Sequence, residues 1–207
     1  MASAVQVCSN ALVMLGEKPI SSFDEADQSG GLDRATLCDE LWPTARDAVL
    51  RSHPWKCAKT RVILSPEATT PAFGYSQQFI LPSNWLRNVE INGVRAEHVD
   101  YEVETASSDN TSKRLLIDQG QVNLIYIWRN DQVESWDALL VEAAELMMAS
   151  KMAYAITQSQ QVQAQYAQLL EIKLREARAV DGQDESPQTF GSFEVLNARR
   201  SVSPRYR

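Results

Sequence analysis

Apolar residues recur with the spacing of an α-helix in the first quarter of the chain. From Ala4 to Leu15 they recur every three or four residues, which predicts a short helix that ends at Gly16. A second, longer pattern runs from about Leu32 to Ser52. Pro43 lies inside this pattern. Because proline lacks an N–H and clashes with the preceding turn, we expect a kink or a break into two helices there.

The last third of the chain returns to helical spacing. One helix is predicted from after Ser135 to about Thr157, and a second from about Gln160 to Val180. With the N-terminal patterns, these segments predict a bundle of about four helices. The buried side of the helix after Ser135 is predicted to carry Trp136, Leu139, Leu140, Ala143, Met147 and Tyr154.

The middle third, from Lys59 to Trp128, changes to the two-residue period of β-strands. Residues 98–104 alternate apolar and polar side chains, which predicts a strand with one solvated face that carries His98. Asn92-Gly93 predicts a hairpin turn, since both residue types accept a positive φ. Gln119-Gly120 predicts another turn. We therefore expect an antiparallel β module of roughly four to six strands.

These patterns predict an α+β fold in three parts. The helical bundle comprises residues 1–58 and 133–180, the inserted antiparallel β module residues 59–132, and an extended C-terminal arm residues 181–207. The arm has no periodicity, and its acidic residues precede its arginines. It is either a disordered terminus or an arm that orders on a neighbouring subunit or partner, with Phe190, Phe193 and Tyr206 as anchors.

Composition narrows the possible environments and partners. No apolar run is long enough to span a membrane, and the N-terminus lacks the pattern of a secretory signal, so we expect synthesis in a cytoplasm. The net charge of −7 argues against a basic face that grips nucleic acid, although an acidic wall would let a duplex slide past. Three widely spaced cysteines with no C-x-x-C pair indicate neither a disulfide framework nor a zinc site.

Residues with catalytic potential are few. The two histidines, His53 and His98, have no nucleophile nearby in a recognisable motif, and the common nucleotide, hydrolase and metalloprotease motifs are missing. Asp24, Glu25 and Asp27 lack the glycine and the closing glutamate of a calcium loop, which favours a solvated loop. The sequence thus predicts no catalytic, cofactor-binding or metal site, and we expect a protein that is not an enzyme.

Four segments in order resemble a known family. They are residues 10–25 (NALVMLGEKPISSFDE), 41–55 (LWPTARDAVLRSHPW), 73–87 (FGYSQQFILPSNWLR) and 136–145 (WDALLVEAAE). This series is similar to the tail tubular protein A family, the head-to-tail adaptors of short-tailed bacteriophages. The resemblance extends over about residues 10–180 and does not include the arm.

The resemblance implies a structural virion protein without enzymatic activity. It implies a dodecameric ring with the portal above, the tail nozzle or tube below, and double-stranded DNA in the lumen. Two other classes remain open. One is a different phage connector, head-completion or minor tail protein, and the other is a soluble enzyme or a bacterial regulatory domain.

A ring whose subunits meet head to tail needs two different complementary patches on each subunit. We therefore expect the end of the arm to bind an acidic surface on an adjacent subunit or on the portal. If its arginines instead line the lumen, they would contact phosphate and make binding salt-sensitive. The predicted contact residues are Arg199, Arg200, Arg205, Tyr206 and Arg207.

Deleting the chain from Gly182 onward should weaken ring or portal binding while leaving the helical fold intact, because the arm adds no periodic element to the bundle. Circular dichroism would check the fold, and sedimentation with a portal ring would check assembly. Unchanged assembly would contradict a contact role for the arm.

Overall fold

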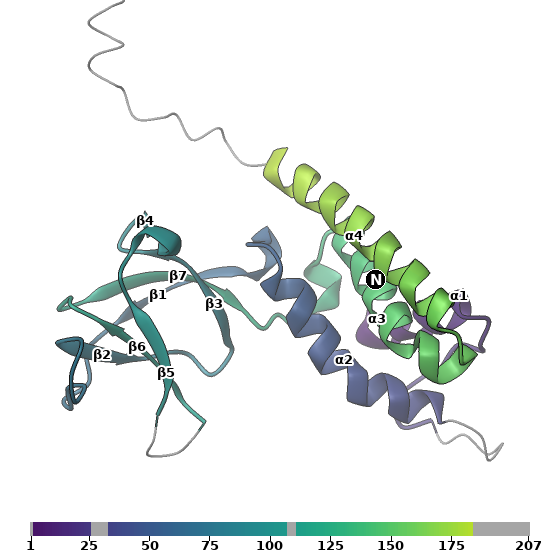
Figure 1. Ribbon diagram of the computed structural model, residues 1–207, viewed down its shortest axis with the longest axis horizontal. Coiled ribbons are helices and arrows are strands. Elements are labelled where there is room, and N and C mark those ends of the chain that lie inside the picture. Colours follow the sequence, from purple (N-terminus) through teal and green to yellow (C-terminus); the bar gives the residue numbers. More distant parts are fainter. Residues whose placement is uncertain (1, 26–32, 107–110, 184–207) are drawn as a thin grey trace, which may run out of the picture.

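The computed structural model describes residues 2–25, 33–106 and 111–183 and has an α+β fold in two lobes (Figure 1). One lobe is a bundle of four helices, and the other is a β module inserted between the second and third helices. The predicted α+β class is confirmed, with four helices in the described part of the chain. The helices are α1 (Ala4–Met14), α2 (Arg34–Arg51), α3 (Ala138–Thr157) and α4 (Gln160–Gln183).

Short polar side chains set where three of the helices begin. Ser3 accepts a hydrogen bond from the Gln6 amide at the start of α1. Asp33 accepts from the amides of Ala35 and Thr36 at the start of α2, and Asp137 accepts from the Leu139 amide at the start of α3. Each of these caps satisfies backbone donors that the first helical turn leaves unpaired.

The second helix runs through Pro43 as one element, so of the two expected outcomes, a kink or a break, the break into two helices does not occur. Cys38 and Trp42 before the proline, and Ala45 and Val49 after it, are buried in the same hydrophobic cluster. Helix α2 packs against α3. Because burial on both sides of Pro43 favours one continuous helical face, tertiary packing outweighs the local cost of the proline.

Helix α3 is the centre of the bundle, since it contacts α1, α2 and α4. Its buried residues lie around the helix and include Ala143, Ala144, Ala149 and Ala153, which let neighbouring helices approach closely. A helix with neighbours on several sides does not show a single apolar stripe. For this reason the predicted buried face is only partly correct: Leu140 is buried, whereas the Tyr154 side chain is exposed.

A tight connection joins α3 to α4. Gln158 closes α3 in the left-handed conformation, with φ of 54°, and α4 begins at Gln160. Farther along, the Tyr166 hydroxyl donates to the carbonyl of Met14 at the end of α1. Helix α4 continues through Gln183, so the first three residues assigned to the extended arm are helical.

The β module consists of two antiparallel sheets. One has the strand order β1-β7-β3-β4 and the other the order β2-β6-β5. The described residues thus form seven strands, one more than the upper end of the predicted range, and the two-residue strand at Val94–Arg95 is too short to show an alternating pattern. The strands are β1 (Lys59–Leu64), β2 (Gln77–Ile80), β3 (Trp85–Ile91), β4 (Val94–Arg95), β5 (Glu102–Thr105), β6 (Lys113–Ile117) and β7 (Val122–Trp128).

The predicted turns occur, but they differ in what they connect. Asn92 and Gly93, with φ of 51° and 81°, join β3 to β4 in a hairpin as expected. Residues 118–121 instead carry the chain from β6 in one sheet to β7 in the other. The strand predicted over residues 98–104 begins only at Glu102, and His98 lies in a short 3-10 helix at Ala96–His98.

Strand β7 faces two hydrophobic clusters. Val122, Leu124 and Tyr126 belong to the cluster inside the β module, and Ile127 belongs to the cluster of the helical bundle. Leu86 on β3 also joins the bundle cluster. The two lobes therefore share apolar packing where β3 and β7 lie nearest the helices. In residues 2–25, 33–106 and 111–183, no helix is long and apolar enough to cross a membrane.

Replacing Gln158 by glycine should raise the free energy of unfolding by about 0.5–1 kcal/mol, because glycine adopts a positive φ without strain. Urea denaturation of the two proteins would measure the difference. The matched control is Gln165→Gly, at an exposed position inside α4, which should lower stability by about 1 kcal/mol. A loss of stability with Gln158→Gly would contradict the conformational argument.

Candidate functional site

The structure leaves the predicted partner contacts untested. Arg199, Arg200, Arg205, Tyr206 and Arg207 all lie outside the described residues. Within the described residues, polar and aromatic side chains come together at the junction between the two lobes and at the end of α4.

Within the described residues, no group of three or more His, Cys, Asp or Glu side chains is placed to hold a metal ion, and neither histidine belongs to such a group. The His98 side chain is largely exposed, with Glu97 3.7 Å away. In the N-terminal loop, Glu25 accepts hydrogen bonds from the amide and hydroxyl of Ser21, and these bonds lower the pKa of Glu25. The Glu25 carboxylate thus takes part in a local turn.

A buried asparagine joins the two chain connections between the lobes. The Asn130 amide donates to the carbonyl of Cys57, on the segment that leaves the bundle, at 2.8 Å. It also donates to the Ser135 hydroxyl, on the segment that returns to the bundle, at 2.9 Å. Its oxygen accepts from the Gln132 amide. Because all these groups are polar and Asn130 is buried, losing the side chain would leave several partners unsatisfied.

Ion pairs reinforce the same junction from the side of α2. Asp47 accepts from the Arg129 guanidinium through both carboxylate oxygens, at 3.2 Å from Nε to Oδ1 and 2.9 Å from Nη2 to Oδ2. This pairing raises the pKa of Arg129. Arg46, which also contacts Asp47, pairs with Asp131. The network fixes the orientation of the β module against α2 more specifically than apolar packing would.

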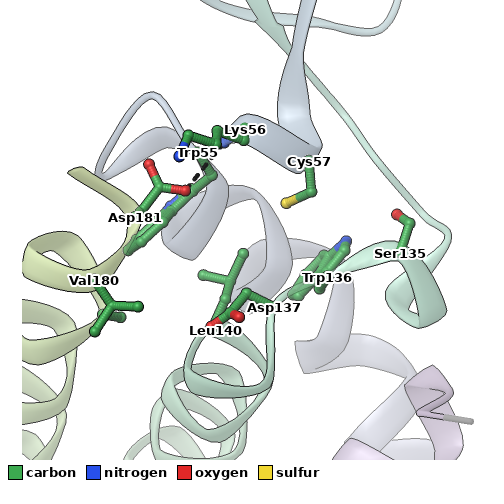
Figure 2. A pocket seen from close by; sticks show the side chains of 10 residues that line it. Trp55, Lys56, Cys57, Ser135, Trp136, Asp137, Leu140, Val180 and Asp181 are labelled. Carbon is green, nitrogen blue, oxygen red and sulfur yellow. Dashed lines mark hydrogen bonds between the residues drawn. The ribbon is translucent and has the colours of Figure 1, made fainter. Parts of the chain in front are cut away.

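A cavity of about 300 Å³ lies beside this junction, at the end of the bundle (Figure 2). Trp55 and Trp136 form aromatic walls, and the Cys57 thiol points into the space between them. The two indoles differ in their hydrogen bonding. The Trp55 Nε1 donates to the carbonyl of Val49 at 2.9 Å, whereas the buried Trp136 Nε1 has no partner among the described residues. The remaining lining comes from Lys56, Ser135, Asp137, Leu140, Ala177, Val180 and Asp181.

The end of α4 is tied to the connection that leaves α2. The Asp181 carboxylate lies 3.4 Å from His53 Nε2 and accepts from the Lys56 amide at 3.4 Å. The His53 ring also meets Trp55 edge-on, with the ring centroids 4.7 Å apart. These contacts explain why the helix continues past Val180: its last turn has partners on another segment.

Burial controls the titration of two groups at this end of the bundle. Burial lowers the pKa of His53, although the carboxylate of Asp181 acts in the opposite direction. Burial raises the pKa of the Cys57 thiol to about 11, with the charge of Asp181 adding to the effect. Cys57 is thus a thiol and not a reactive thiolate near neutral pH.

Exposed apolar side chains mark possible contact surfaces on both lobes. In the β module, Phe73 is 89% exposed and Ile63 is 66% exposed. In the bundle, Ile172 on α4 is 61% exposed and Val13 on α1 is 56% exposed. Large apolar side chains at this exposure are typical of surfaces that become covered in an assembly, provided that they cluster.

Sequence reasoning missed the cavity and the junction. Trp55 and Trp136 stand in the sequence next to boundaries between helical and β patterns, but Asn130, Cys57 and Asp181 carried no signal of their own. Their positions depend on the fold bringing together residues 55–57, 130–137 and 177–181.

A scan of the chain against models of protein families found no match, and a search of curated proteins found none either. The functional argument therefore rests on the fold and on the residues themselves.

A pH titration of stability tests the environment of His53. A histidine whose pKa is lower in the folded than in the unfolded chain stabilises the fold fully above the ordinary value of 6.5, and this contribution is lost as pH falls toward the folded pKa. Between about pH 7 and pH 5, wild type should therefore lose more stability than His53→Gln. Urea midpoints at each pH would measure this.

If wild type and His53→Gln have parallel pH profiles, burial does not dominate the titration of His53.

Proposed function

We propose that this chain is a structural virion protein of a tailed bacteriophage, the head-to-tail adaptor. In this proposal it forms a dodecameric ring that binds the portal protein above and the tail nozzle or tube below. Double-stranded DNA passes through the lumen of the ring without sequence-specific binding. The protein has no enzymatic role.

The observation that carries the proposal is that the four segments of the family resemblance bond to one another. Asn10, in the first segment, donates to Glu145, in the fourth, at 2.6 Å. Trp42, in the second, stacks on Trp136, in the fourth, with the ring centroids 6.1 Å apart. Both contacts join helices of the bundle, so the segments that resemble the family are also segments that build its packed interior.

The third segment, residues 73–87, lies in the β module and contacts the second segment and the bundle core. Arg51, in the second segment, donates to the carbonyl of Leu86, in the third, at 3.2 Å. Leu86 also packs in the bundle cluster with Trp42 and Trp136. The resemblance thus falls on the bundle core and on the joint between the lobes. These are the parts that a family of adaptors would need to keep their two lobes in a fixed relation.

The surface chemistry is compatible with a ring. A cyclic ring requires two different patches on each subunit, one for each neighbour. The exposed apolar residues of α4, Leu169 and Ile172, and those of α1, Val13 and Met14, supply apolar surface on separate helices. The net charge of −7 favours a lumen that repels phosphate over one that retains DNA.

The adaptor proposal is tested with the portal ring encoded in the same genome. The purified chain and the portal should form a coaxial complex, because the adaptor ring builds on the symmetry of the portal. Electron microscopy would show the stacked rings, and mass measurement would give twelve chains. A complex of other geometry would favour a head-completion or minor tail protein, and no complex at any salt concentration would contradict the proposal.

A pair of variants separates assembly from folding in this experiment. Ile172→Asp places a charge on the exposed apolar surface of α4 and should lower the yield of complete rings, since burying an unpaired carboxylate is costly. Gln163→Asp changes an exposed polar position on the opposite side of the same helix, nine residues before Ile172, and should assemble as wild type does. Equal yields would exclude this face of α4 as a subunit contact.

A further inference from the structure

The cavity between Trp55 and Trp136 has the properties of a binding site for an apolar side chain. Its walls include both indole rings together with Leu140, Ala177 and Val180. Its volume of about 300 Å³ accommodates one aromatic side chain. Figure 2 shows the space opening between the end of α4, the start of α3 and the connection that follows α2.

Polar residues also line the cavity, namely Lys56, Ser135, Asp137 and Asp181. These residues lie beside an apolar wall that includes two indole rings. The site is therefore suited to a peptide whose backbone meets the polar residues while one apolar side chain enters the cavity.

The position of the end of α4 indicates which segment would occupy the cavity. Val180 and Asp181 line the cavity, and the described chain stops at Gln183, half a turn later. The first large apolar residue after that point is Phe190. The stretch from Gln183 to Phe190 spans at most about 25 Å, enough to turn back to the cavity. Because so short a tether gives a millimolar effective concentration, the chain's own segment has the advantage over a second copy.

We propose that residues 184–196 of the same chain dock on this cavity, with the Phe190 ring between Trp55 and Trp136. The segment is thereby held against its own bundle at the end where α3 begins and α4 ends. This inference does not depend on the adaptor role, because it concerns a contact within one subunit.

The accessibility of the Cys57 thiol provides a measure of the docking. Its thiol points into the cavity, whereas Cys8 and Cys38 are fully buried in the bundle core. The labelling rate of Cys57 by a maleimide, at one fixed pH, therefore follows the population with an empty cavity. Phe190→Ala in the full chain should raise this rate about fivefold or more. Tyr206→Ala, also an aromatic of the terminal segment, is the matched control and should leave the rate unchanged.

Adding the segment as a separate peptide distinguishes a loss of docking from an indirect effect of Phe190→Ala. A synthetic peptide of residues 184–196 should slow Cys57 labelling again in the full-length Phe190→Ala protein, and the same peptide with alanine in place of Phe190 should not. Wild-type protection should be independent of protein concentration. The proposal is overturned if Phe190→Ala labels within twofold of wild type. It is equally overturned if wild-type protection disappears on dilution, which would assign the cavity to a second copy.

Discussion

The insertion of a β module into a helical bundle imposes one constraint on this fold: the chain must leave the bundle and return to it at the same place. Asn130 meets this constraint directly, since its buried amide bonds Cys57 on the outgoing connection and Ser135 on the returning one. Ser135 lies only two residues before the cap of α3, so the same bonds fix where the central helix begins. The bundle and the orientation of the β module therefore depend on one small polar cluster. The Asp47–Arg129 ion pair further constrains the orientation of the β module against α2.

The central position of α3 follows from this arrangement. The outgoing and returning connections place α2 and α3 side by side, and the tight turn at Gln158 then places α4 on another side of α3. Trp42 and Trp136 stack where α2 and the start of α3 meet, next to the connections. Large aromatic rings suit such a seam, because they cover the junction of two lobes with few side chains. The Trp136 Nε1 donor is buried at this seam without a hydrogen-bond partner among the described residues.

The helices, the fold class and the Asn92-Gly93 hairpin could be predicted from sequence because each depends on local periodicity or local backbone preference. The continuity of α2 through Pro43 could not, since it depends on burial against α3 on both sides of the proline. The division of the β module into two sheets was also beyond local signals, as residues 118–121 have the composition of a hairpin turn but connect different sheets. The cavity was missed for the same reason: Trp55, Trp136 and Val180 are far apart in the chain.

The end of α4 links these structural features to assembly. Asp181 holds the last turn of the helix to His53 and to the Lys56 amide, so the direction in which the chain continues is fixed relative to the lobe junction. In the two proposals above, the terminal segment has two competing positions, one on its own bundle and one on a neighbouring subunit. A contact within the subunit needs no partner and would dominate in the isolated chain, so a ring contact would have to offer more apolar burial or better charge pairing to displace it. The acidic-then-basic order of residues 184–207 provides for such a difference, because only the distal arginines are complementary to an acidic neighbour.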